Sequence, residues 1–176
     1  MSVDDGRVVG THIGVPFYTI GQGAGIGGSE RRWFVADKNV AGNIVYVAED
    51  ASHPALLTKS LMAAKVSWWV PPSASEFACD VQVRSMKEPS PGVVKWYHQK
   101  ELFVNFFFFP PRDEGNGTMH VSLSEPQRSI APGQAIVLSQ GDLIVAAAEV
   151  TDRVPVQPFT KRTVVTEQET EEQVLT

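Results

Sequence analysis

Few residues of this chain have the types and spacing that enzyme chemistry requires. Its 176 residues include 1 Cys and 4 His. No nucleophile, base and orienting group form a recognisable set, and no glycine-rich loop is followed by Lys-Ser or Lys-Thr. The side chains alone therefore indicate a binding module in which no active site is visible.

A glycine-rich stretch near the N-terminus matches the pattern G-x-G-x-x-G through Gly23, Gly25 and Gly28. This pattern binds a pyrophosphate only where a strand precedes it and a helix begins at its last glycine. A strand is expected before it, at residues 17–20. After it, residues 29–32 are too few for a helix, and residues 33–36 resemble another strand. We therefore expect a sharp bend between two strands, where glycine supplies positive φ angles.

His12 and Cys79 are the other candidates for chemistry. His12 has no second ligand at metal spacing, which favours a structural or surface role. Cys79 alternates in phase with Phe77 and Val81, which predicts a buried thiol. A reactive cysteine needs a lowered pKa and access to solvent, so Cys79 is interpreted as structural, and a single cysteine allows no internal disulfide.

Two features are compatible with RNA binding, whereas the overall charge argues against it. Arg31 and Arg32 are either phosphate contacts or a solvated pair, the simpler interpretation. Phe106 to Phe109 form either a stacking platform for bases or, as we favour, a buried strand or an insertion. The net charge is −5, from 15 basic and 20 acidic residues, which argues against an autonomous nucleic-acid binder because phosphate contacts dominate such affinity.

Composition predicts a globular protein with a packed core. Hydrophobic residues make up 43% of the chain, and no apolar run approaches the ~20 residues of a membrane helix. The N-terminal residues have the features of neither a signal peptide nor a transit peptide.

Short strands separated by turns dominate the expected secondary structure. Two strands are expected within residues 8–20, and Ser52 is expected to cap a helical turn at 54–57. The alternation of Met62, Ala64, Val66 and Trp68 predicts that these side chains share one buried face. Other strands are expected at residues 33–36, 44–48, 77–83, 93–97, 102–109, 119–123, 135–138 and 143–150. This pattern predicts a mainly β fold with a small barrel.

The chain divides into three predicted parts. Residues 1–60 form a first β domain, residues 61–150 form the barrel, and residues 151–176 form a tail. The tail is rich in Thr, Glu and Gln and has no clear period, so we expect it to be disordered.

An ordered series of motifs resembles the tRNA-specific 2-thiouridylases, which place sulfur on the wobble uridine of certain tRNAs. The series covers roughly residues 6–150 at family-like spacing. It consists of Tyr18-Thr-Ile-Gly-Gln, Gly25-Ile-Gly-Gly, Trp33-Phe-Val-Ala-Asp-Lys, His53-Pro-Ala-Leu and Glu125-Pro-Gln-Arg-Ser-Ile-Ala-Pro-Gly-Gln-Ala-Ile-Val.

The resemblance implies a small SH3-like β roll followed by a β-barrel similar to the second domain of elongation factors, which together help to grip tRNA. The family's catalytic ATP-pyrophosphatase domain carries a Ser-Gly-Gly-x-Asp-Ser loop and two cysteines that relay sulfur. The loop is missing from these residues, and Cys79 lies outside the catalytic positions. We therefore expect no catalytic residue, cofactor or metal in this chain, with ATP, a sulfur-carrier protein and a separate catalytic domain belonging to the complete enzyme.

Carried over residue by residue, the resemblance implies tRNA contacts at Arg84, Ser85 and Gln134. The family reads Arg-Tyr-Arg where this chain has Arg84-Ser85-Met86, so Ser85 lacks the aromatic ring. Without the resemblance, Gln134 would be interpreted as a cap of its own Pro-Gly turn, and Arg84 as a solvated charge.

Departures from the family pattern leave alternatives open. Residues 22–28 are shorter than the bacterial glycine stretch and lack its basic residues, which resembles the mitochondrial members and implies a mitochondrial location, although the chain shows no targeting segment. As a member of this family, the chain would be a fragment, the product of an incorrectly predicted gene, or one piece of a split enzyme. The alternative is a catalytically inert β-barrel interaction module, which the acidic charge and the altered Arg-Tyr-Arg favour.

Overall fold

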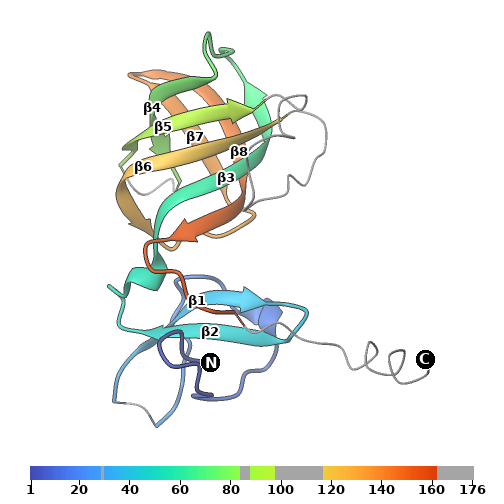
Figure 1. Cartoon of the computed structure of the whole chain (residues 1–176), viewed down its shortest axis with the longest axis vertical. Coiled ribbons are helices and arrows are strands. Elements are labelled where there is room, and N and C mark those ends of the chain that lie inside the picture. Colours follow the sequence, from blue (N-terminus) through green and yellow to red (C-terminus); the bar gives the residue numbers. More distant parts are fainter. Residues whose placement is uncertain (29, 84–87, 98–116, 162–176) are drawn as a thin grey trace, which may run out of the picture. The chain divides into compact units, whose positions relative to one another are not determined.

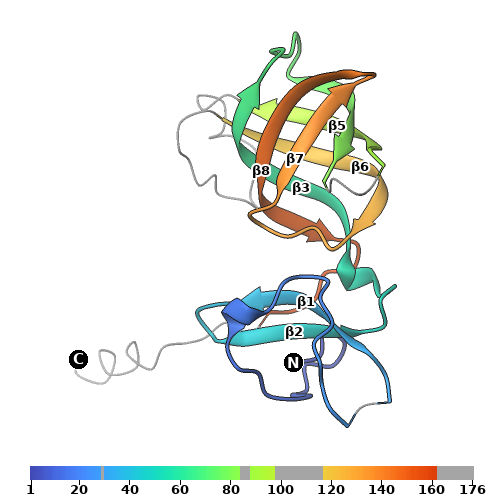
Figure 2. The ribbon, with the colours of Figure 1, turned by 180° about the vertical axis from the view of Figure 1, so that it is seen from behind.

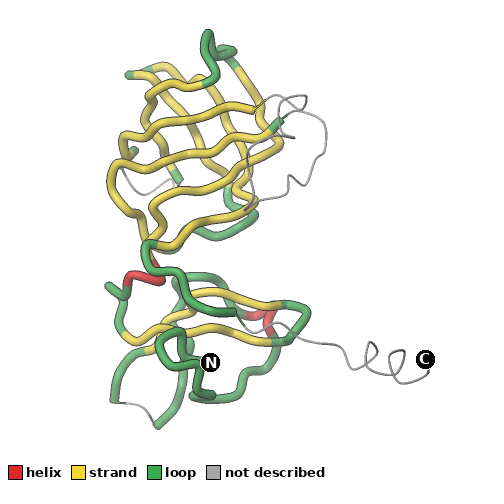
Figure 3. Tube along the Cα trace, viewed as in Figure 1, coloured by secondary structure: helices red, strands yellow, loops and turns green. Residues whose placement is uncertain are grey.

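The computed structural model describes residues 1–28, 30–83, 88–97 and 117–161. The chain divides into two compact units. The first consists of Met1–Ala51 together with residues from Phe159 onward, and the second of Ser52–Pro158. Strands dominate the second unit, whereas loops make up much of the first, and the described helices are two short turns (Figure 3). None of the helices in the described part of the chain is long and apolar enough to cross a membrane.

The first unit is built on an antiparallel pair, β1 (Trp33–Asn39) and β2 (Ile44–Glu49). In the turn between them, Asn39 Oδ1 accepts a hydrogen bond from the Gly42 N–H at 2.9 Å. The apolar side chains of the pair form a small core of Val15, Trp33, Val35, Val45 and Val47. The predicted pairing of these two strands is confirmed.

The two strands expected within residues 8–20 are wrong. The only regular element described there is a 3-10 helix, η1 (Val15–Phe17). Pro16 has no N–H to give to a sheet, and Gly14 before it has a φ of 138°. The glycine segment follows the edge of β1 instead, through a bridge between Gly23 and Phe34.

The second unit is a closed barrel in which every neighbouring pair is antiparallel. The strand order is β3-β6-β5-β4-β7-β8, and Figures 1 and 2 show its two sides. The strands are β3 (Leu57–Trp68), β4 (Glu76–Gln82), β5 (Ser90–Tyr97), β6 (Thr118–Arg128), β7 (Ala135–Gln140) and β8 (Leu143–Pro155). The predicted mainly β fold with a barrel is confirmed. The strand expected at 102–109, with its four phenylalanines, lies outside the described residues.

Inward side chains fill the barrel interior, as expected for a barrel of few strands. On β4 and β6 they are the ones that the alternation predicted, including Cys79, Val81, Met119 and Val121. On β3, the prediction that Met62, Ala64, Val66 and Trp68 share one face is wrong for the first half of the strand. Leu61 and Ala63 join the core before Lys65, and Val66 joins it after.

A β-bulge explains this change of face. The pairing of β3 with β8 shifts between Ala64 and Ser67, and Lys65 has a φ of 53°. An extra residue in one strand moves the following side chains to the opposite face. Met62 and Ala64 therefore lie on the outward face of β3, although both are largely buried.

The predicted boundaries also shift. β3 begins at Leu57 and is preceded by η2 (Pro54–Leu56), so the division lies at Ala51–Ser52 and not near Ser60. The helical turn is confirmed, but its cap is His53, whose Nδ1 accepts from the Ala55 N–H at 3.1 Å, and not Ser52.

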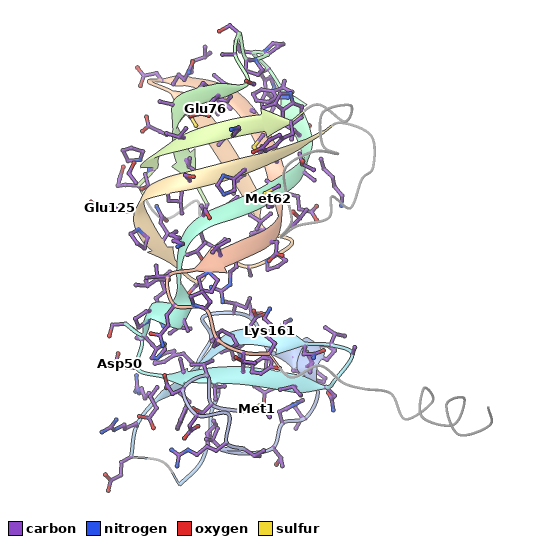
Figure 4. The ribbon with its side chains drawn as sticks, viewed as in Figure 1. Met1, Asp50, Met62, Glu76, Glu125 and Lys161 are labelled. Carbon is purple, nitrogen blue, oxygen red and sulfur yellow. The ribbon has the colours of Figure 1, made fainter. Side chains whose placement is uncertain are left out.

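The expected tail begins as ordered structure. Residues 151–155 continue β8 and pair with β3, and the chain then rejoins the first unit, where Phe159 packs against Tyr46 and Lys161 pairs with Asp37 at 2.7 Å. Lys161 is labelled in Figure 4. The rest of the predicted disordered tail, 162–176, lies outside the described residues.

Candidate nucleic-acid interface

Gln134 lies in the turn between β6 and β7. Its side-chain Oε1 accepts a hydrogen bond from the Ala131 N–H at 3.0 Å, and its backbone carbonyl accepts one from the Val150 N–H at 2.8 Å. Gly133 completes the turn with a φ of 87°. The side chain thus caps its own turn, which was one of the two interpretations of this residue.

The cap leaves the other half of the Gln134 amide available. The side chain is half-buried, and its Nε2 makes no hydrogen bond to any residue within the described ranges. An amide nitrogen carries two donors. Gln134 can therefore stabilise its turn and still donate to an external acceptor such as a phosphate or a base.

The segment before this turn fixes its position. Ile130 is buried in the barrel core, while Ser129 has a φ of 62° and donates its N–H to the Leu56 carbonyl at 3.2 Å. The motif from Glu125 to Gln134 therefore positions the turn through one core side chain and one left-handed residue.

Arg84 and Ser85 lie outside the described residues, and their RNA contacts stay predictions. The last residue described before them is Val83, which is buried in the barrel core. Gln82 pairs with Val137 in an antiparallel register, so the end of β4 and the start of β7 lie at the same end of the barrel. The Gln134 turn immediately precedes β7 at that end.

Ion pairs neutralise most of the described surface cations. Among the described residues, salt bridges join Arg7 to Asp5, Arg31 to Glu49, Lys65 to Glu149, Lys95 to Glu76 and Lys161 to Asp37. Arg32 and Lys59 are exposed and form no ion pair with a residue that the structure describes. A strongly positive surface of the kind that dominates RNA affinity is therefore not formed by the described residues.

Cys79 has the buried position predicted for it. The residue is 8% exposed and belongs to the barrel core. Burial, with a smaller contribution from the Asp80 carboxylate, raises the pKa of the thiol to about 11. A reactive cysteine shows the opposite shift, so the structural interpretation is confirmed.

We expect Cys79→Ser to lower the free energy of unfolding by about 1–3 kcal/mol, because a hydroxyl buried without a partner loses its hydration. Denaturant unfolding measures this loss. Cys79→Ala is the control, since it creates a small cavity but buries no polar group. In the native wild type, thiol labelling should be slow at neutral pH. Fast labelling together with an unchanged stability of the serine variant would contradict a buried thiol.

No metal centre or nucleotide loop takes shape in the described part of the chain. Within residues 1–28, 30–83, 88–97 and 117–161, there is no group of three or more His, Cys, Asp and Glu side chains that could hold a metal. His12 instead joins two backbone segments, with its Nε2 3.0 Å from the Asn43 carbonyl and its Nδ1 3.1 Å from the Gly14 N–H. None of the described residues between Gly28 and the start of β1 at Trp33 is helical, so these residues do not provide the pyrophosphate-binding geometry.

Comparison with known proteins gives matches in both units. The profile of the tRNA methyl transferase PRC-barrel domain matches residues 1–49, and that of the aminomethyltransferase β-barrel domain matches residues 112–150. The tRNA-specific 2-thiouridylase of Halalkalibacterium halodurans is 37% identical over 153 residues, which is 85% of this chain. That of Paraburkholderia xenovorans is 34% identical over 169 residues, which is 92% of this chain.

The chain is thus related to the tRNA-specific 2-thiouridylases. It spans only part of their length, 37% of the Halalkalibacterium protein and 40% of the Paraburkholderia protein. The PRC-barrel match ends two residues before Ala51, where the N-terminal segment of the first unit ends. The structural division and the PRC-barrel profile therefore agree on where the N-terminal segment of the first unit ends.

Sequence reasoning missed one buried residue of the thiouridylase-like barrel. Arg153 on β8 is 6% exposed, and its Nη1 donates to the Ala55 carbonyl and to Thr58 Oγ1, both at 3.3 Å. It thereby ties η2 and the start of β3 to the last strand. No periodic pattern marks residues 151–155, so the sequence offered no signal for this arginine.

Proposed function

We propose that this chain is the tRNA-binding half of a tRNA wobble-uridine 2-sulfurtransferase. The observation that carries the proposal is the alignment with tRNA-specific 2-thiouridylases, which runs through both β units at 34–37% identity. The Nε2 donors of Gln134, which bond to none of the described residues, support it locally, since they can donate hydrogen bonds from a turn that is fixed by the barrel core.

The finer parts of the proposal concern the complete enzyme. ATP-dependent activation of the uridine and receipt of sulfur from a carrier protein would take place on a catalytic domain with its own Ser-Gly-Gly-x-Asp-Ser loop, a motif that is not found in these 176 residues. The short glycine segment at 22–28 supports a mitochondrial type of enzyme and a mitochondrial location, whereas the relatives named above are bacterial.

A second candidate is a catalytically inert interaction module of the same ancestry. The observation that favours it is electrostatic: five described cations are paired with carboxylates, and the net charge is −5. The two candidates differ in whether the chain binds tRNA.

The test is the affinity of the purified chain for tRNA at fixed, low salt, because phosphate contacts weaken with salt. We expect measurable binding, and roughly three- to tenfold weaker binding by Gln134→Glu, which corresponds to about one hydrogen bond. This variant keeps an oxygen for the Ala131 N–H and replaces the Nε2 donors with a second, negatively charged oxygen. Gln140→Ala, at the opposite end of β7, is the control.

Absence of tRNA binding by the wild type would favour the inert module. Binding by Gln134→Glu equal to that of the wild type would remove Gln134 from the interface while keeping the proposed function. Added tRNA, ATP and a persulfide donor should give no 2-thiouridine with this chain alone.

A further inference from the structure

We propose that a shallow pocket in the first unit binds one nucleotide of RNA through the phosphate group. The pocket is lined by Arg31, Arg32, Phe34, Glu49, Asp50 and Ala51. It lies on the first unit and does not involve the Gln134 turn of the barrel. The inference rests on the proposed function, because it takes tRNA as the source of the nucleotide.

The β1–β2 pair builds this pocket. Trp33 at the start of β1 is paired with Glu49 at the end of β2, so the residues just outside the pair, Arg32 and Asp50, face each other. The Asp50 N–H donates to the Arg32 carbonyl at 3.1 Å, and Asp50 has a φ of 70°. Asp50 is labelled at the edge of this unit in Figure 4. The backbone that carries Arg32 is therefore held against the end of β2.

The two arginines have different roles in this pocket. Arg31 Nη1 lies 2.8 Å from Glu49 Oε2, so its charge is compensated within the fold. Arg32 is exposed and forms no ion pair with a described residue. A guanidinium is a good donor to phosphate oxygens. Arg32 is therefore the side chain that binds the phosphate.

Phe34 supplies an apolar surface in the same pocket. Phe34 is half-buried on β1, and it lines the pocket together with Arg32. Aromatic rings stack on bases without regard to sequence. A phosphate on Arg32 places the attached nucleoside within reach of this ring, which is the combination used by proteins that bind single-stranded RNA.

The charge of the pocket favours RNA over a free nucleotide. The formal charges of Arg31, Arg32, Glu49 and Asp50 cancel. A phosphodiester carries one negative charge, whereas a nucleoside triphosphate brings several close together and would be repelled by the two carboxylates. The pocket therefore matches a single backbone phosphate.

The test compares the tRNA affinity of the full chain with that of three variants. Arg32→Ala should weaken binding by roughly three- to tenfold and reduce the slope of log affinity against log salt by about 0.7–0.9, as expected for one lost phosphate contact. Arg7→Ala is the control for the loss of one exposed positive charge from the same unit, because Arg7 is paired with Asp5 and does not line the pocket. Glu49→Gln should strengthen binding, since it releases Arg31 from its carboxylate.

A second measurement separates this inference from the proposed function. The backbone amide NMR signals of residues 30–34 are followed during titration with pentauridylate and, separately, with ATP. Shifts with pentauridylate alone support an RNA nucleotide site, even if the wild type fails to bind tRNA and the proposed function is lost. Shifts with ATP at lower concentration than with pentauridylate would overturn the choice of RNA. Wild-type tRNA affinity in Arg32→Ala, or no shift with either ligand, would overturn the site.

Discussion

Replacing Trp96 by alanine is expected to lower the free energy of unfolding of the barrel by about 3–5 kcal/mol. Trp96 is 6% exposed and projects from β5 into the barrel core. Its ring meets that of Trp68 edge to face, with 5.3 Å between the centroids. Alanine would remove this aromatic contact and leave a cavity that the closed sheet cannot collapse to fill.

The control for this prediction is Trp69→Ala. Trp69 has the same side chain but is 64% exposed, so its removal should change the stability by no more than about 0.5 kcal/mol. Denaturant unfolding followed by circular dichroism measures both variants. Equal effects of the two substitutions would show that Trp96 does not support the barrel core.

Gly92→Ala should lower the stability by about 1–3 kcal/mol through overpacking. A Cβ atom at Gly92 would lie 2.8 Å from the Ser122 carbonyl oxygen and 2.9 Å from a methyl carbon of Val81. The first of these atoms belongs to the backbone of the neighbouring strand β6 and cannot move without disturbing the sheet. The substitution therefore forces β5 away from β6.

Gly27→Ala separates this effect from a general cost of replacing glycine. No heavy atom lies within 4 Å of a Cβ at Gly27, and its φ is not in the left-handed region. We expect a neutral effect or a gain of up to about 1 kcal/mol, because alanine restricts the unfolded chain. Thermal unfolding measures the stability of both variants. A lower stability of Gly27→Ala than of Gly92→Ala would contradict the close spacing of the strands at Gly92.

Much of the barrel was predictable because its signal is local. The alternation of Phe77, Cys79 and Val81 marks the inward face of β4, and the turn residues near Asn43 mark the β1–β2 hairpin. These patterns depend only on the two-residue period of a strand and on turn chemistry.

The errors arose where a single backbone feature overrides the pattern. The φ of 53° at Lys65 reverses the faces of β3, yet lysine carries no sequence signal for a bulge. Likewise, Pro16 interrupts an apolar stretch that otherwise resembles a strand, and His53 replaces Ser52 as a cap because its ring nitrogen reaches the Ala55 N–H.

The candidate site was predictable in part. Gln134 was identified through its family motif and lies on the expected turn, but its dual use of Oε1 and Nε2 depends on the geometry of residues 131–134. The pocket at Arg32 was beyond sequence reasoning, because Arg31 and Arg32 are adjacent in the chain and only the structure shows that Glu49 pairs with one of them.

The return of the chain to its first unit has a consequence for synthesis on the ribosome. Phe159 packs on the buried Tyr46, and Lys161 pairs with Asp37. Domains generally fold as they emerge, the N-terminal one first. Here the residues that complete the N-terminal unit are translated after the last strand of the barrel. The N-terminal unit is therefore begun first and finished last, and until then Tyr46 remains without its aromatic cover.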